Sequence, residues 1–208
     1  MVGLGGCAAI ATLLTAFLPD HLTAQVSLHA TVGARYTSPL VHDSIVLPVD
    51  VQPAVGPALA LAISQRSSSP WTPDANLDVS WSSLQRHESG TTSKFNSVTT
   101  IAFTVGVRRE IAHGLTARAG FGAIKHLPSE AIGMFRAGTG LWALGTASLY
   151  WTPAAAGVAH DIGLSLRYDV HRFSTAALHA DGFTSTQLVH RLSLGIGMRI
   201  LGKGATAP

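Results

Sequence analysis

The sequence has few of the charged residues that most soluble domains carry on their surfaces. Charged residues make up 12% of the 208 residues, and the mean hydropathy is +0.31. A soluble domain usually has about twice that charged fraction. An apolar composition of this kind excludes an intrinsically disordered chain. The arginines are scattered and the formal net charge is only +3, so we expect no nucleic-acid partner.

Cysteine is almost absent as well. Cys7 is the only one, and it lies in an apolar segment at the start of the chain. If that segment is removed, the mature protein has no thiol. Disulfides, thiolate metal sites and cysteine nucleophiles are then excluded together, and we expect no cofactor.

The apolar segment has the pattern of a signal peptide. Residues 2–19 are almost wholly apolar, Asp20 and His21 begin a polar region, and Ala24 precedes a cut at Gln25. We therefore predict a signal peptide at 1–24, a barrel at 25–201 and a C-terminal tail at 202–208. The alternative is an uncleaved membrane anchor, for which the segment is barely long enough.

After the leader, apolar and polar residues alternate with a period of two, which predicts β-strands. Eight segments show this pattern: 26–36, 55–65, 77–82, 100–108, 115–123, 141–151, 161–170 and 188–200. The segment 141–151 is ambiguous because both of its faces carry apolar groups. Most segments are close to the length that a tilted strand needs to cross a bilayer.

The connections alternate in length. Those at 37–54, 85–97, 125–140 and 171–186 are long, and those at 66–73, 109–114 and 152–157 are short. Long outer loops and short periplasmic turns are typical of membrane barrels. The predicted fold is all-β: an eight-stranded antiparallel up-and-down transmembrane β-barrel with both termini on the periplasmic side.

The polar faces distinguish this fold from a soluble barrel. They consist of Gly, Ser, Thr, Ala, Arg and Asp, with almost no Lys or Glu, which suits a narrow, filled interior. We predict an ion-pair network in the lumen, because unpaired buried charges would be very costly. Its members are Arg35, Asp78, Arg108, Arg118, Asp161, Arg167, Asp169, Arg191 and Arg199. In the last hairpin, a register centred near Ala180 sets Asp169 opposite Arg191 and Asp161 opposite Arg199.

Aromatic residues near the strand ends predict two belts at the membrane surfaces. The predicted belt residues are Tyr36, Trp71, Trp81, Trp142, Tyr150, Trp151 and Tyr168.

This layout resembles the small bacterial outer-membrane barrels of the OmpA, OmpX and OmpW type. The resemblance covers residues 26–200 and lies in the strand pattern rather than in a diagnostic motif. It implies a bacterial outer-membrane location, contact with outer-membrane lipid, recognition by the barrel-assembly machinery and a monomeric barrel. The chain departs from the family at its end, where Met198-Arg199-Ile200-Leu201 replaces a final aromatic residue.

The ten histidines show no metal-site spacing. We expect solvated loop histidines at His42, His87, His126, His171 and His179, and we expect no metal. His126, Ser129 and Glu130 are the residue types that a lipid A-modifying barrel enzyme would need. They share one loop that no strand holds rigid, so we expect no enzyme.

We therefore expect a structural or surface-interaction role, either in envelope integrity or in adhesion through the outer loops. Two alternatives remain: a narrow pore for small solutes and a lipid A-modifying enzyme. Eight strands leave an interior that side chains just fill, which argues against a true porin.

Overall fold

The computed structural model describes residues 26–43, 49–65, 69–88, 90–153, 162–183 and 186–201. The predicted signal peptide at 1–24 and the tail at 202–208 lie outside the described residues, as does Asp161. Among the described residues, no helix is both long and apolar enough to cross a membrane.

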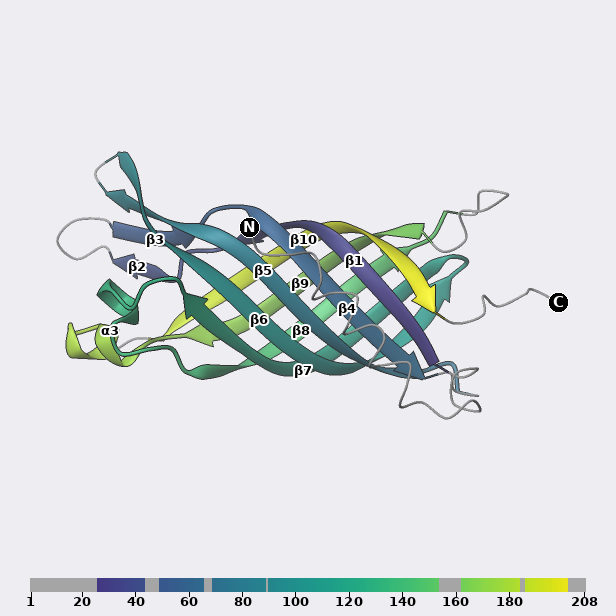
Figure 1. The fold of residues 1–208 in the computed structure, drawn as a ribbon. Helices are drawn as coiled ribbons and strands as arrows, with labels where there is room; N and C mark the ends of the chain where they lie inside the picture. Colours follow the sequence, from purple (N-terminus) through teal and green to yellow (C-terminus); the bar gives the residue numbers. More distant parts are fainter. Residues whose placement is uncertain are drawn as a thin grey trace, which may run out of the picture.

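Eight strands form a closed antiparallel ring (Figure 1). They are β1 (Val26–Thr37), β4 (Gly56–Gln65), β5 (Thr72–Glu88), β6 (Thr91–Ala112), β7 (Leu115–Pro128), β8 (Leu141–Trp151), β9 (Ile162–Phe173) and β10 (Gln187–Leu201). Each strand pairs with the next along the chain, and β1 closes the ring by pairing with β10. The predicted fold class, an eight-stranded up-and-down barrel, is confirmed.

The wall is apolar outside and polar inside, as the alternation predicted. On β9, Leu164 and Leu166 point outward and are 48% and 43% exposed, whereas Arg167 and Asp169 are buried in the lumen. Strand closure pairs the backbone groups that hydrocarbon could not satisfy. An apolar wall around a polar, closed interior is the arrangement of a transmembrane β-barrel.

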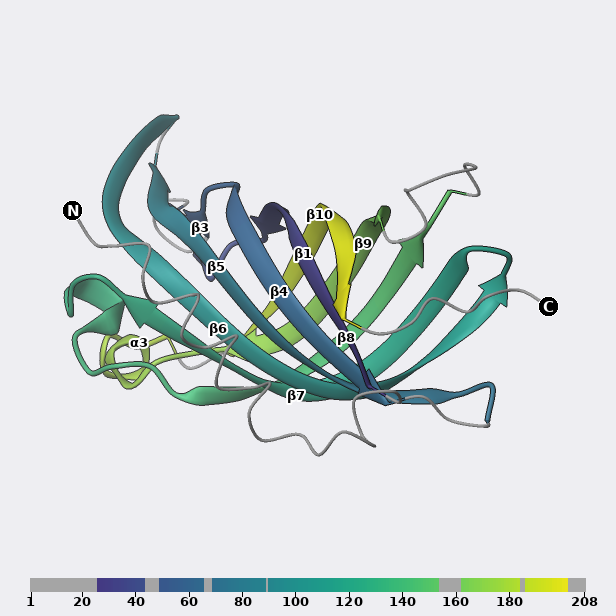
Figure 2. The same cartoon turned by 45° about the vertical axis from the view of Figure 1, so that its right-hand side comes forward.

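Two strands, β5 and β6, are much longer than the segments 77–82 and 100–108 that the sequence pattern predicted. β5 continues to Glu88 and β6 begins at Thr91, so the predicted loop at 85–97 is a β-hairpin instead. Its turn includes Gly90, whose φ of +80° is in the region that favours glycine. β3 (Val49–Pro53) pairs with the outer part of β5, and β2 (Val41–Asp43) pairs with β3. These strands form a sheet that projects beyond the barrel (Figure 2).

One connection at the opposite end of the barrel is a tight turn. β6 and β7 join through His113 and Gly114, where Gly114 has a φ of +71°. β1 begins and β10 ends at this same end of the barrel, away from α3 (Ala176–Ala180) (Figure 1). Most of the predicted connection at 152–157 lies outside the described residues.

Candidate functional site: the charged lumen and its plugged mouth

Arginine and aspartate side chains meet across the middle of the lumen. Arg35 of β1 donates two hydrogen bonds to Asp78 of β5, one of them 2.6 Å from Nη2 to Oδ2. Arg167 of β9 donates from Nε to Asp169 Oδ1 at 2.7 Å. These four side chains are almost fully buried. The pairing gives each buried carboxylate a close guanidinium partner.

Arg191 of β10 lies between these two pairs. Its Nη2 is 3.4 Å from Asp78 Oδ1, and its Nη1 is 3.6 Å from Asp169 Oδ2. Nη2 also donates to Ser80 Oγ at 3.2 Å. Asp169 is directly opposite Arg191 in the β9–β10 register, so the predicted register of this hairpin is confirmed. The Asp161–Arg199 half of that prediction lies outside the described residues.

A third close ion pair lies nearer the end of the barrel where β1 begins and β10 ends. Arg118 Nε donates to Asp74 Oδ2 at 2.8 Å. The sequence interpretation missed Asp74 because it started the third strand at Leu77. Had the alternation been followed back through Asn76, Asp74 would have fallen on the same inward face as Asp78.

The remaining predicted lumen arginines lie nearest the chain termini. Arg108 donates from Nη2 to Ser27 Oγ at 3.1 Å and also contacts Ser64 Oγ. Arg199 is partly buried on the inward face of β10 and is opposite His29 in the β1–β10 register. The hydrogen-bond partners of Arg108 are therefore serine hydroxyl groups, whereas the mid-lumen arginines pair with aspartates.

Two histidines that we expected in solvated loops are buried in the lumen. His126 is 1% exposed and His171 is 2% exposed, and their ring centroids are 5.2 Å apart. The expectation was wrong because β7 and β9 continue to Pro128 and Phe173. In the longer strands, His126 and His171 simply extend the inward alternation. Among the described residues, no three His, Cys, Asp or Glu side chains gather as a metal site.

The predicted aromatic belts need a correction at two positions. Tyr36, Trp71, Trp81, Trp151 and Tyr168 are each more than 40% exposed. Trp142, by contrast, packs against a buried cluster inside the barrel. Tyr150 also lies inside, where its hydroxyl donates to the Gly197 carbonyl at 3.0 Å. A Cβ at Gly163 or Gly197 would come within 2.8 Å of the Tyr150 ring, so these two glycines make room for it.

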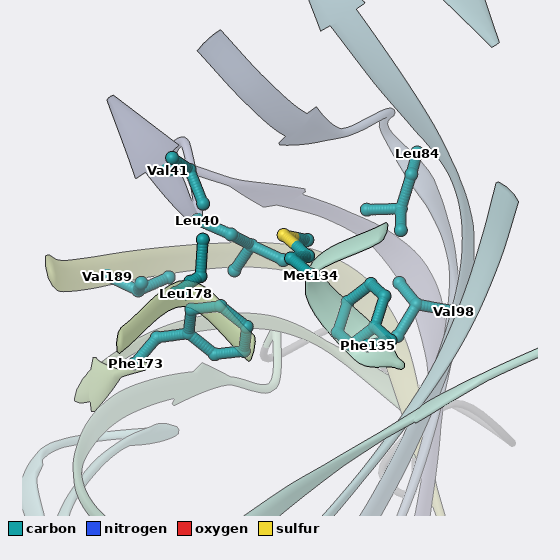
Figure 3. Close-up of a cluster of buried hydrophobic side chains, with 9 residues drawn as sticks. All are labelled: Leu40, Val41, Leu84, Val98, Met134, Phe135, Phe173, Leu178 and Val189. Carbon is teal, nitrogen blue, oxygen red and sulfur yellow. The ribbon is translucent and has the colours of Figure 1, made fainter. Parts of the chain in front are cut away.

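A cluster of buried apolar side chains, which we call the mouth plug, lies at the end of the barrel that carries the projecting sheet (Figure 3). The plug comprises Leu40, Val41, Leu84, Val98, Met134, Phe135, Phe173, Leu178 and Val189. Met134 and Phe135 come from the short 3-10 helix η1 (Gly133–Phe135), and Leu178 comes from α3. Phe135 and Val189 are fully buried. The sequence interpretation did not predict this plug, because it depends on contacts between loops far apart in the chain.

Polar contacts hold the two plug-forming loops together. Thr175 Oγ1 donates to the Met134 carbonyl at 2.6 Å and accepts from Leu178 N at 3.2 Å, which caps α3. On the surface, Arg136 and Asp181 form an ion pair at 2.6 Å. The hydrogen bond and the charge of Asp181 raise the pKa of Arg136.

The residues considered for lipid-modifying chemistry are divided between the lumen and the surface. His126 is buried in the lumen. Ser129 Oγ donates to Asn96 Oδ1 at 2.6 Å and accepts from Ser97 Oγ at 2.9 Å, on the exposed side of the loop. Glu130 is exposed, and its backbone carbonyl accepts from Asn96. The side-chain bonds of Ser129 therefore join it to the projecting hairpin.

Comparisons with known proteins gave only structural likenesses. No protein-family model matches the chain, and no curated protein sequence matches it. Among solved structures, Ail of Yersinia pestis in complex with the heparin analogue sucrose octasulfate is 12% identical, with a TM-score of 0.49 over 85% of this chain and 99% of that one. The outer membrane protein OprG of Pseudomonas aeruginosa is 10% identical, with a TM-score of 0.47 over 86% and 97%.

The chain's own geometry supports a membrane location. Its exposed wall carries large apolar residues on every strand of the ring, with aromatic residues toward both ends. Closed antiparallel barrels with such a wall are the outer-membrane type. The chain therefore has the architecture of an integral outer-membrane β-barrel.

Proposed function

We propose that the chain is a closed barrel that acts at the cell surface, as an adhesion or surface-interaction protein whose contact surface is the projecting sheet. The observation that carries this proposal is the mouth plug. It turns the loop end into a solid platform rather than the entrance to a channel.

Two layers support a closed lumen. The plug buries Phe135, Phe173 and Val189 almost completely at the mouth. Beneath it, Arg35, Asp78 and other charged side chains span the interior with hydrogen bonds. Eight-stranded barrels have interiors just wide enough for such side chains. A solute would have to displace both layers.

The projecting sheet offers a polar contact surface. The hairpin of β5 and β6 carries Arg86, Thr91, Thr92, Ser93 and Lys94, all of them exposed. Paired backbone holds these side chains in fixed positions, so binding would cost less ordering than it would on a loose loop. A rigid platform of this kind is suited to surface contact.

The proposal can be tested with a variant in which the β5–β6 hairpin is shortened. Residues 86–93 are replaced by Asn-Gly, a dipeptide that favours a two-residue β-turn. Attachment of cells that express each form is then counted on uncoated polystyrene and on collagen. We expect the shortened form to reach the outer membrane and to lose the attachment that the full chain confers. Glu110→Gln, at the opposite end of the barrel, is the control and should attach normally. Equal attachment by the shortened form would contradict the proposal.

A narrow pore is the second candidate, because the lumen below the plug is polar. A role in envelope integrity is the third. Detergent sensitivity of cells lacking the chain distinguishes the third from adhesion. If the shortened form restores resistance as well as the full chain does, the barrel itself carries that role.

A further inference from the structure

Four arginines and three aspartates form the buried charge cluster of the lumen. Three pairs are close: Arg35 with Asp78, Arg118 with Asp74, and Arg167 with Asp169. Arg191 is the fourth guanidinium, and its contacts to aspartates are the longer ones, at 3.4 and 3.6 Å. All seven side chains are at most 9% exposed.

The cluster therefore holds one more positive charge than it holds negative charges. In the part of the chain that the structure describes, only these three carboxylates form ion pairs with the four guanidinium groups. A buried charge without a counter-charge is strongly unfavourable. A single negative charge in the same region would balance the cluster.

A small cavity lies beside the cluster. Its volume is about 60 Å³, several times the roughly 10–15 Å³ that one water molecule requires. Three arginines of the cluster and several hydroxyl groups line it: Arg35, Arg118, Arg167, Thr31, Ser165 and Ser193. Guanidinium groups and hydroxyl groups therefore form much of the polar lining of the cavity.

We propose that this cavity binds one small monovalent anion of halide size, such as chloride. Guanidinium and hydroxyl donors suit a spherical anion, and a single charge matches the excess of the cluster. A divalent anion such as sulfate would exceed the single excess charge of these seven groups. Asp78 also lines the cavity, but Arg35, Arg167 and Arg191 surround its carboxylate, which offsets its repulsion. The site is independent of any contact made by the projecting sheet.

The first test uses the unaltered chain. The refolded barrel is crystallised in sodium bromide, and anomalous scattering locates the bromide ions. We expect one bromide in the cavity, within hydrogen-bond distance of a donor of Arg35, Arg118 or Arg167, which line it. Bromide found only on the outer surface, with water alone in the cavity, would overturn the proposal.

The second test measures unfolding by urea in lipid vesicles, in sodium chloride and in sodium gluconate at equal ionic strength. Gluconate is too large for the cavity. We expect chloride to raise the unfolding midpoint of the full chain progressively with concentration, because a ligand of the folded state stabilises it. In Arg191→Gln the three close pairs remain and the excess charge is gone, so the chloride effect should shrink severalfold.

Arg86→Gln is the matched control, because it removes the same charge from the exposed hairpin. It should keep the full chloride effect. An equal chloride effect in Arg191→Gln and in the unaltered chain would contradict the proposal. If Arg191→Gln does not fold, the bromide measurement still decides the question.

Discussion

Asp169 and Arg191 are directly opposite each other on β9 and β10, and their side chains approach to 3.6 Å inside the lumen. Arg167 is a second and closer partner of Asp169, at 2.7 Å. Asp169 therefore serves two guanidinium groups, whereas Arg191 divides its contacts between Asp169 and Asp78. Because of this asymmetry, removing Asp169 and removing Arg191 should lower the free energy of unfolding by different amounts.

Asp169→Ala should lower the free energy of unfolding by about 3–5 kcal/mol, because Arg167 and Arg191 would then depend on Asp78, which already pairs with Arg35, and the buried positive charge would be in larger excess. Arg191→Ala should cost less, since Asp169 keeps Arg167. Adding Arg191→Ala to Asp169→Ala should recover part of the loss. Urea unfolding of the three variants in lipid vesicles measures the coupling, and strictly additive losses would show that the pair contributes nothing.

The loss of stability caused by an arginine on the outward face of β10 should depend on how deep in the bilayer the arginine lies. Leu194 is 62% exposed near the middle of the strand, and Leu188 lies on the same face near the loop end. Leu194→Arg should destabilise the barrel by roughly 2–4 kcal/mol, and Leu188→Arg by no more than about 1 kcal/mol. Vesicle unfolding measures both. Equal costs at the two depths would show that this face does not cross a bilayer.

The structure changes one comparison that the sequence suggests. From alternation alone, Ser193 is a polar-face position at which an arginine should be tolerated better than at Leu194. However, Ser193 Oγ accepts a hydrogen bond from Arg35 Nε at 2.6 Å. Another guanidinium there would enter a cluster that already has excess positive charge, so Leu188→Arg is the better control.

The strand pattern could be predicted from the sequence because lipid and lumen demand opposite chemistry on alternate residues. Alternation placed Asp169 and Arg191 on the polar face, and a hairpin centred near Ala180 set them opposite each other. The hairpin beyond residue 85 could not be predicted in this way, because outside the membrane neither face needs to be apolar. The sequence around Phe135 did not indicate the plug, since the burial of this ring depends on residues of several strands and of α3 that lie far apart in the chain.

The belt prediction was wrong at Trp142 and Tyr150 because it used residue type and position along the strand without the facing direction. Both faces of β8 carry apolar residues, so its alternation did not decide which side faces lipid. Single-tryptophan variants in vesicles with brominated acyl chains test the correction. Fluorescence of Trp151 should be quenched strongly and that of Trp142 weakly. Strong quenching of Trp142 would place it in lipid and contradict the structure.

The mouth plug should contribute to the stability of the folded barrel. Phe135→Ala should cost about 3–5 kcal/mol, because the ring is fully buried among apolar side chains. Ile132→Ala, in the same loop at a 44% exposed position, should cost far less. Urea unfolding compares the two. A similar small loss in both variants would mean that the plug packs only loosely.

The surface ion pair of Arg136 with Asp181 should contribute less to the stability of the folded barrel than the buried hydroxyl of Thr175 does. Exposed ion pairs contribute little to stability, so Asp181→Ala should lower the free energy of unfolding only slightly. Thr175→Ala removes a helix cap and the bond to Met134, and it should cost about 1–2 kcal/mol. The reverse order in vesicle unfolding would show that the surface pair, rather than Thr175, holds the plug.

The lumen of the folded barrel should be closed to ions and small solutes, which leaves the platform at the loop end as the part of the protein that acts. Planar-bilayer recording of the refolded full chain measures whether the lumen is closed. We expect no discrete conductance steps, because the plug and the charge cluster both block the interior. Stable, reproducible conductance steps from the unaltered chain would contradict this expectation.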